Sequence, residues 1–351
     1  MLEYITNGDT IIYGPEYNEN LNMELISGYS RLIFMNKKLE KIENLERDSN
    51  KIRMKEESKF NKKISKIPES IKYLVLGHYF NQEISELGNS LTHLKIINYI
   101  NPCLVHTLRH NGFNKGVSNL PESIKHLTLG EFFNQEVSNL PENLMELNLG
   151  YSFNQEVSNL PSNLKYLRLG NNFNQSVSNL PENLKYLILG NNFNQSVSYL
   201  PSKLSELTLG HEFNEEISKL PESIVKLSIG LLYNKESVIP SNIKYLKLYC
   251  NNSHIINSLP NSIIELELEP NLNSNYTIEN LPTSIKKLVI CKFSNFDAEL
   301  NCLPKFIEEL QLNYNYKKRI LNIPPNLKKI ICYKKYPYKE DFVGCDVETY
   351  D

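Results

Sequence analysis

The sequence lacks the features that mark secreted, membrane-spanning or disulfide-bonded proteins. Trp is absent, and no run of apolar residues is long enough to cross a membrane. The N-terminus has no basic segment followed by an apolar one, as a secretory signal would have. The six cysteines lie far apart and form no CxxC pair, which indicates reduced thiols. We therefore expect an intracellular, cytoplasmic protein that has no contact with a membrane.

Charge and motifs give no sign of nucleic-acid binding or catalysis. A formal net charge of -2 predicts no general attraction to nucleic acid. The motifs GxxxxGK[ST], GxSxG and HExxH are absent, so we predict no catalytic site and no cofactor. Cys103, His106 and His110 lie close together and could bind zinc, but no fourth ligand is evident, and we assign no metal site.

Prolines mark an internal repeat of about twenty residues. They recur every 20 residues from Pro121 to Pro221 and at spacings of 19 to 22 residues as far as Pro324. Each unit reads approximately LPxxLxxLxLGxxFNxxVSx, and Pro68 begins an upstream copy. A fixed period of this length is typical of solenoids, in which each unit forms one coil and packs only on its neighbours.

The leucines of one unit predict a strand with one buried face. Leu167 and Leu169 alternate with Tyr166 and Arg168, which is the period of a strand. So short a strand needs equivalent strands beside it, about 4.8 Å away in a parallel ladder. The rest of the coil is too short for a long helix. The sequence predicts a leucine-rich-repeat-like solenoid with a curved parallel sheet on the concave side, an extended or 3₁₀ convex side and little α-helix.

The residues after each strand are predicted to form the turn. We interpret Gly170 as a residue whose backbone conformation a side chain would forbid, and Phe173 as the apolar filling of the turn. The Asn after each Phe is predicted to form a buried ladder that satisfies backbone groups, although a surface turn residue is the alternative. The ladder would comprise Asn81, Asn114, Asn134, Asn154, Asn174, Asn194, Asn214 and Asn234.

Irregularities in the repeat suggest three segments. Residues 60–332 are predicted to form about twelve coils. Residues 1–59 should form an N-terminal cap with degenerate coils at 11–21 and 31–45 and a charged surface segment at 46–59. Residues 333–351 should form a C-terminal cap or tail, and residues 93–110 a kink or an extruded loop.

The segment FNQEVSNLPENLMELNLG, residues 133–150, resembles the FNIP repeat. This leucine-rich-repeat relative is known from amoebae and from viruses that infect them, and the resemblance covers roughly residues 60–330. Such repeats are often attached to an F-box, which would imply a substrate-recognition adaptor of a ubiquitin ligase. Residues 1–50 show no run of three amphipathic helices, so this is the second hypothesis.

A third hypothesis, an enzyme, comes from the LPxxLxxLxL half of the unit. This half resembles the short leucine-rich repeats of bacterial effectors, which can carry a ligase domain after the repeats. Fewer than thirty residues follow Pro324, and the preceding chain is occupied by repeats, so we predict no catalytic domain.

The first hypothesis is a monomeric, non-catalytic scaffold that binds an unidentified protein through the solenoid surface. Tyr166, Arg168, Tyr186 and Ile188 should lie on adjacent strands, and Tyr and Arg are enriched in interface hot spots. Tyrosines also suit any pleated surface, and a purely structural protein stays an open alternative. The other outward Lys and Glu residues alternate in sign, which is typical of a solvated face. The candidate surface residues are Tyr73, Tyr166, Arg168, Tyr186, Ile188 and Tyr245.

Overall fold

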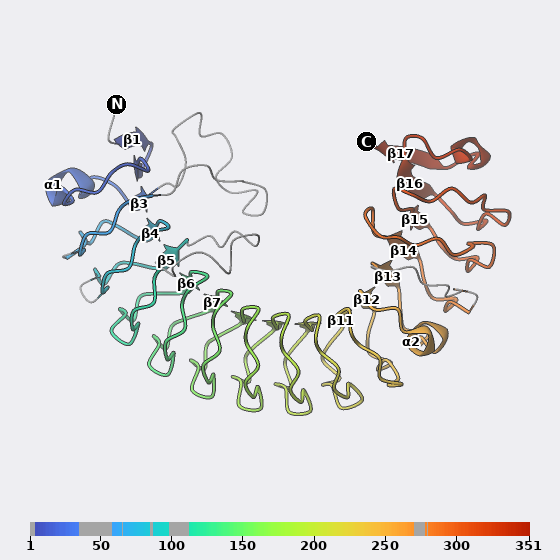
Figure 1. The fold of residues 1–351 in the computed structure, drawn as a ribbon, viewed down its shortest axis with the longest axis horizontal. Coiled ribbons are helices and arrows are strands. Elements are labelled where there is room, and N and C mark those ends of the chain that lie inside the picture. Colours follow the sequence, from blue (N-terminus) through green and yellow to red (C-terminus); the bar gives the residue numbers. More distant parts are fainter. Residues whose placement is uncertain are drawn as a thin grey trace, which may run out of the picture. The chain divides into compact units, whose positions relative to one another are not determined.

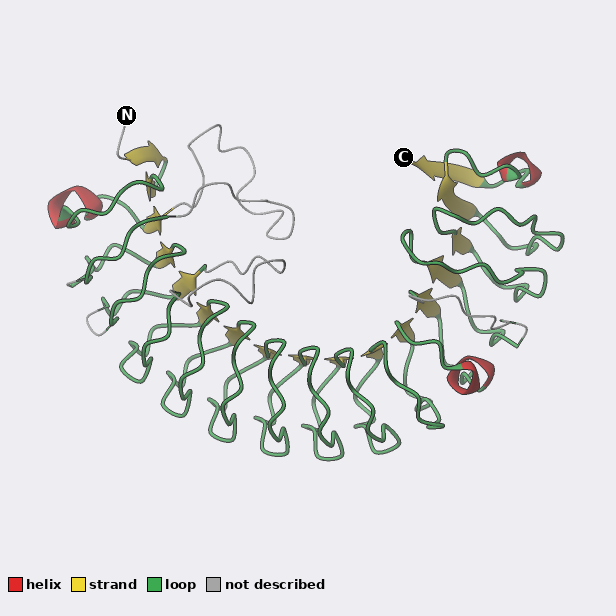
Figure 2. Ribbon diagram, in the orientation of Figure 1, coloured by secondary structure: helices red, strands yellow, loops and turns green. Residues whose placement is uncertain are grey.

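The computed structural model describes residues 4–34, 58–64, 66–84, 87–97, 112–269, 278 and 280–351. The chain forms two compact units, Met1–Gln175 and Ser176–Asp351. Within each unit, short strands stack along one side of the coils, and loops form the remainder (Figures 1 and 2).

The first unit holds one antiparallel and six parallel strand pairings. Strand β1 runs antiparallel to β2, and each later strand pairs in parallel with the one before it. A four-residue helix, α1 (Met23–Ile26), lies between β2 and β3. The strands are β1 (Tyr4–Asn7), β2 (Thr10–Tyr13), β3 (Arg31–Phe34), β4 (Tyr73–Leu76), β5 (His93–Ile96), β6 (His126–Leu129), β7 (Glu146–Leu149) and β8 (Tyr166–Arg168).

The second unit is a parallel sheet from its first strand to its last. Helix α2 (Ser253–Asn257) and the 3₁₀ turn η2 (Lys339–Asp341) are its described helical elements. The strands are β9 (Tyr186–Ile188), β10 (Glu206–Thr208), β11 (Lys226–Ile229), β12 (Tyr245–Leu248), β13 (Glu265–Leu268), β14 (Lys287–Ile290), β15 (Glu309–Gln311), β16 (Lys329–Tyr333) and β17 (Asp346–Tyr350). The predicted solenoid with a parallel sheet and little helix is confirmed.

Equivalent leucines pair with one another across the strands. Leu127 of β6 is opposite Leu147 of β7, which is opposite Leu167 of β8, and all three are buried. Strands β4 and β6 to β16 are each preceded by a tight turn in which a proline carbonyl accepts a hydrogen bond from the amide three residues on, as from the Leu144 amide to Pro141. Before β5, Gly88 takes the place of the proline. The core is therefore a set of columns running through successive coils, because every coil repeats the same buried positions.

Stacked aromatic rings form one of these columns and account for the curvature within each unit. Neighbouring rings in the series Phe60, Phe80, Phe113, Phe133, Phe153 and Phe173 are 6.1 Å apart and nearly parallel. In the second unit Phe193, Phe213 and Tyr233 stack at 6.0–6.1 Å. Paired strands are only about 4.8 Å apart. The coils therefore diverge away from the sheet, which places the strands on the concave side.

Glycine after the strand has a different role from the one predicted. Among the described glycines, only Gly8 and Gly344 have a positive φ, so Gly170 does not need an unusual backbone conformation. Instead, a Cβ atom on Gly170 would lie 1.7 Å from the carbonyl oxygen of Gly150. Glycine is required there because the backbones of neighbouring coils approach too closely for any side chain.

The ends of the chain also contribute strands. Residues 4–34, within the predicted N-terminal cap, form β1, β2 and β3, and Tyr17 stacks on Phe60 at 6.2 Å. At the other end, β17 lies within the predicted cap or tail of residues 333–351. Most of the predicted charged segment and of the irregular unit at 93–110 lies outside the described residues.

Candidate interaction surface

Strand side chains that point away from the core form the candidate surface. In β6, Leu127 and Leu129 are buried, whereas His126 and Thr128 are half-exposed. We call the side chains in these two alternating columns the outward face. In the first unit, from β3 to β8, the half-exposed or exposed members are Arg31, Tyr73, His93, Lys95, His126, Thr128, Glu146, Asn148, Tyr166 and Arg168.

Five side chains on consecutive strands of the first unit touch in a continuous row. The Arg31 guanidinium lies 4.6 Å above the Tyr73 ring, whose centroid is 5.3 Å from that of His93. The rings of His93 and His126 stack 4.2 Å apart at 9°. Nδ1 of His126 is 2.9 Å from a carboxylate oxygen of Glu146. We call this series, from β3 to β7, the ring row.

The surroundings of the row lower the pKa of one member, His93. Burial of the ring and the nearby His126 both lower the pKa of His93, and Glu146 only partly opposes them. A histidine with a lowered pKa is neutral near pH 7, so its ring carries an N–H donor without a full charge.

The outward face of the first unit carries more basic than acidic side chains. From β3 to β8 it holds Arg31, Lys95 and Arg168 but only one carboxylate, Glu146. Within the part of the chain that the structure describes, neither Lys95 nor Arg168 has an ion-pair partner. This face therefore presents basic groups that no carboxylate of the described residues neutralises.

The second unit differs, because all four lysines of its outward face from β9 to β17 are paired with carboxylates. The nitrogen–oxygen distances are 2.6–3.5 Å, and most pairs join adjacent strands. Half-exposed pairs of this kind contribute little stability each, but they neutralise the surface. The pairs are Lys226–Glu206, Lys247–Glu267, Lys247–Glu269, Lys287–Glu265, Lys287–Glu309 and Lys329–Glu348.

Lys247 is the most enclosed of these lysines. Burial by itself would lower its pKa, but hydrogen bonds to Glu267 and Glu269 outweigh burial and raise the pKa. Its ammonium also lies 4.7 Å from the centroid of the Tyr249 ring. A lysine held protonated in this way is suited to a structural ion pair and not to proton abstraction.

The six candidate residues chosen from the sequence fall in both units. Tyr73 is in the ring row, and Tyr166 and Arg168 are on β8. Burial raises the pKa of the half-buried Tyr166. The other three, Tyr186 and Ile188 on β9 and Tyr245 on β12, belong to the second unit. That Tyr166, Arg168, Tyr186 and Ile188 form one patch stays a prediction.

Sequence reasoning did not select His93 and His126, although both stand in the outward columns. The available signal was their register: each occupies the same place in its unit as Tyr73, so the three rings had to become neighbours on adjacent strands. The repeat therefore gives their adjacency, whereas the stacked geometry comes from the structure.

The asparagine column forms hydrogen bonds between coils. Within each unit, the side-chain oxygen of one Asn accepts from the backbone N–H of the next Asn in the column, at 2.8–3.1 Å. The expectation that this ladder is buried was wrong, because its members are half-exposed or exposed. The preceding Phe fills the interior and leaves the Asn at the rim. The column contains Asn18, Asn61, Asn81, Asn114, Asn134, Asn154 and Asn174 in the first unit, and Asn194, Asn214 and Asn234 in the second.

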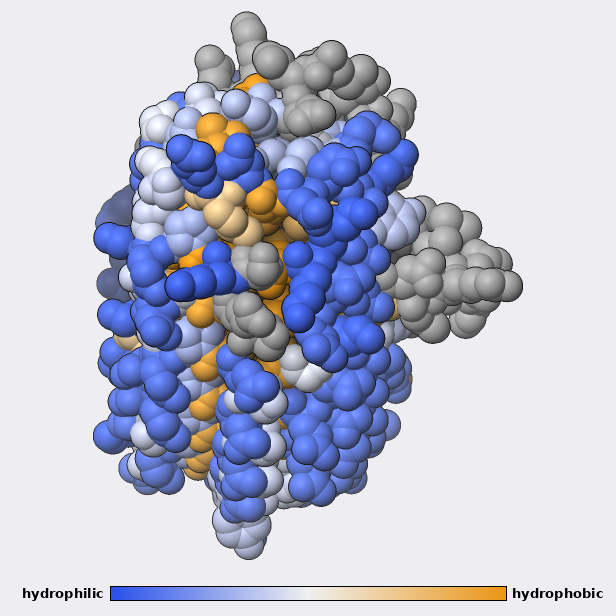
Figure 3. Space-filling model, turned by 90° about the vertical axis from the view of Figure 1, so that its left-hand side faces the viewer, coloured by the Kyte–Doolittle hydropathy of each residue, from blue (hydrophilic) through white to orange (hydrophobic). Residues whose placement is uncertain are grey.

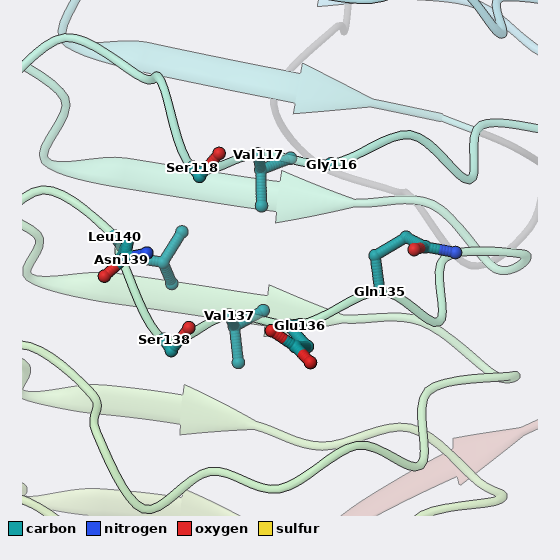
Figure 4. A pocket seen from close by; sticks show the side chains of 9 residues that line it. All are labelled: Gly116, Val117, Ser118, Gln135, Glu136, Val137, Ser138, Asn139 and Leu140. Atoms are coloured by element: carbon teal, nitrogen blue, oxygen red, sulfur yellow. The ribbon is translucent and has the colours of Figure 1, made fainter.

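Other features offer little for binding a small ligand. A shallow hollow in the first unit is lined by residues 116–118 and 135–140, and the polar ends of Gln135 and Glu136 do not converge on one point (Figure 4). No group of three or more His, Cys, Asp or Glu residues among the described ones could hold a metal ion. Cys103, His106 and His110 lie outside the described residues.

Surface composition and helix content are also informative. Hydrophilic side chains cover most of the face in Figure 3, and apolar ones appear as narrow strips.

None of the helices in the described segments is both long and apolar enough for a membrane span. Residues 4–34 hold three strands and one short helix, so this described stretch does not contain the three helices expected of an F-box.

Comparison with known proteins agrees with the repeat architecture. A solved protein described as CroV588, a novel circular LRR protein, is 30% identical to this chain, with a TM-score of 0.66. The alignment covers 92% of this chain and 46% of CroV588, so this chain spans about half the length of CroV588. YopM from Yersinia enterocolitica is 17% identical with a TM-score of 0.42, and the alignment covers 90% of this chain and 76% of YopM. No curated protein matches.

The model of the FNIP repeat matches residues 60–99, 113–151, 133–172, 153–191, 173–210, 233–271 and 295–334. These segments make up more than half of the sequence and include most of the strands from β4 to β16. The chain therefore belongs to the FNIP repeat family.

Proposed function

We propose that this protein is a non-catalytic, intracellular scaffold that binds a partner protein through the outward face of its sheet. The frame of the coils is maintained by buried Leu and Phe columns and, as far as Asn234, by the rim asparagines, none of which belongs to the outward face. The residues on that face differ from strand to strand while the frame repeats. Their variation therefore suits recognition, because it can change without loss of the fold.

The observation that carries the proposal is the ring row with its neighbouring basic side chains. Tyr and Arg dominate interface hot spots because they combine a large apolar area with polar groups. Here Arg31 and Tyr73 already contact one another, so little side-chain freedom is lost when a partner binds. The fold and the repeat family support a scaffold in the same way, since solenoids present extended surfaces for binding.

Crosslinking in the native cell followed by mass spectrometry tests this function. The wild-type chain should give a defined partner with crosslinks to the strands. Tyr73→Ala and His126→Ala should each reduce recovery about tenfold, the equivalent of ~1.4 kcal/mol. Tyr199→Ala is the matched control, because Tyr199 is 75% exposed and lies outside the strands.

The same capture tests the tyrosines chosen from the sequence. Tyr166→Ala and Tyr186→Ala, measured separately, show whether β8 and β9 contribute to the partner contact. If recovery is the same for every outward-face variant and for Tyr199→Ala, the partner binds elsewhere, and the proposal fails.

A further inference from the structure

We propose, on the basis of the interaction function above, that the outward face of the first unit docks an acidic segment of a partner protein. The ring row and the side chains of Lys95 and Arg168 would form the docking surface. Lys95 and Arg168 are positively charged, and within the described part of the chain neither has a carboxylate as an ion-pair partner. An incoming carboxylate therefore gains a charge-assisted contact without displacing an existing one.

The carboxylate of Glu146, which is already on this face, does not neutralise Lys95 or Arg168. Glu146 is held by Nδ1 of His126 at 2.9 Å, so its charge is directed at the ring row. Lys95 and Arg168 occupy the second outward column, alongside the row and not within it. The surface therefore combines a row of rings with a neighbouring column that holds two cations, for which the described segments supply no ion-pair partner.

In the second unit, the lysines of the equivalent outward face are already paired with carboxylates. Each of its four outward lysines has a carboxylate within 2.6–3.5 Å. An acidic segment would have to break these ion pairs, and the free energy lost with them would largely cancel the free energy gained from the new contacts. The difference between the two units predicts that acidic partners prefer the first.

Ring geometry favours a protein over a single-stranded nucleic acid. Nucleic-acid surfaces use exposed ring faces on which bases stack. In the ring row, the faces of His93 and His126 are stacked on one another at 4.2 Å, and Arg31 covers a face of Tyr73. At least one face of each ring is thus covered, and the ring edges carry the N–H and O–H groups that can donate to carboxylates.

A fluorescence anisotropy titration tests the proposal with a labelled peptide of alternating Glu and Ala residues. The control probes are the same peptide with Gln in place of Glu and a labelled oligothymidylate. At low salt the wild-type protein should bind the acidic peptide and neither control. The double variant Lys95→Gln, Arg168→Gln should weaken binding about tenfold or more, which corresponds to ~1.4 kcal/mol.

The matched control is Lys226→Gln, Lys287→Gln, which removes the same charge from the outward face of the second unit. It should change binding less than about twofold, and circular dichroism should show both double variants folded. Equal weakening by both would indicate non-specific attraction and would overturn the proposal. Absence of acidic-peptide binding, or tighter binding of the oligothymidylate, would also overturn it.

The outcomes separate this inference from the scaffold function. If Tyr73→Ala and His126→Ala reduce capture of the native partner but the acidic peptide does not bind, the scaffold stands and the acidic-segment proposal falls. If capture is insensitive to the outward face while the acidic peptide binds as expected, the docking chemistry stands, and the scaffold function needs another partner site.

Discussion

Substitution of Gly170 by Ala tests whether close packing of backbones, and not backbone conformation, requires glycine after each strand. The new Cβ would lie 1.7 Å from the carbonyl oxygen of Gly150, whereas real Cβ contacts are essentially never under 3.0 Å. Neighbouring coils must therefore separate locally by about 1.3 Å, the difference between those two distances.

That separation has a calculable cost. It would stretch two hydrogen bonds of 2.9 Å between the coils, from the Asn172 amide to the Tyr151 carbonyl and from the Asn174 amide to the Asn154 side chain. Each contributes ~0.5–1.5 kcal/mol, and overpacking adds ~1–3 kcal/mol. Ala restricts the unfolded chain and so recovers only ~0.4–1 kcal/mol. The net expectation is a destabilisation of ~1–6 kcal/mol.

Urea denaturation followed by circular dichroism measures this effect, and the chain supplies its own control. A Cβ on Gly116 would have no atom within 4 Å, and its φ is not positive. Gly116→Ala should therefore be neutral or stabilising by up to ~1 kcal/mol. If Gly170→Ala unfolds at the same urea concentration as Gly116→Ala, the close-approach explanation is refuted.

Three further substitutions give independent predictions. Phe153→Ala removes a fully buried ring from the stacked column and should destabilise the protein by ~3–5 kcal/mol in the same urea assay; a loss under ~1 kcal/mol would contradict the column. Asn134→Ala removes the acceptor for the Asn154 amide, and because this rim is accessible to water it should cost only ~1 kcal/mol and speed hydrogen exchange at Asn154. Because the pKa of His93 is lowered in the folded protein, the unfolded chain binds that proton at higher pH, and the free energy of unfolding should fall as pH drops below about 6.5. His93→Gln should reduce this fall in thermal melts. If the variant keeps the wild-type pH dependence, the titration of His93 does not cause the fall.

The fold was largely predictable because the repeat states each core position many times. Leu127, Leu147 and Leu167 recur at one spacing, so the alternation in a single unit and the period between units together determine strand pairing and register. The stacked Phe positions follow from the same period. A single strand of this length would not have supported the prediction, but many copies in register did.

Two features depended on details that a repeat pattern does not contain. The reason for Gly170 is the distance to the neighbouring backbone, and the sequence alone gives no distance between coils. The asparagines were expected inside the coil because buried backbone needs partners, but Phe takes the interior volume and leaves Asn154 at the rim. Both depend on how space is shared between neighbours.

The candidate surface was predictable in position but not in content. Outward columns followed from strand alternation, and Tyr73 was selected correctly as a member. The stacking of His93 on His126 was not foreseen, and neither was the unequal neutralisation of Lys95 and Lys226. These depend on which charged side chains become neighbours, which becomes clear only when each residue is compared with its partner on the next strand.

The rim asparagines give the stack a direction. Asn134 accepts a hydrogen bond from Asn154, which in turn accepts one from Asn174, so each coil within this ladder supplies one acceptor and uses one supplied by its predecessor. A duplicated unit of twenty residues would thus enter the stack without leaving any bond unmade. Gene-level gain or loss of whole coils would alter the length of the protein while keeping each junction intact, a route by which such chains can evolve different lengths.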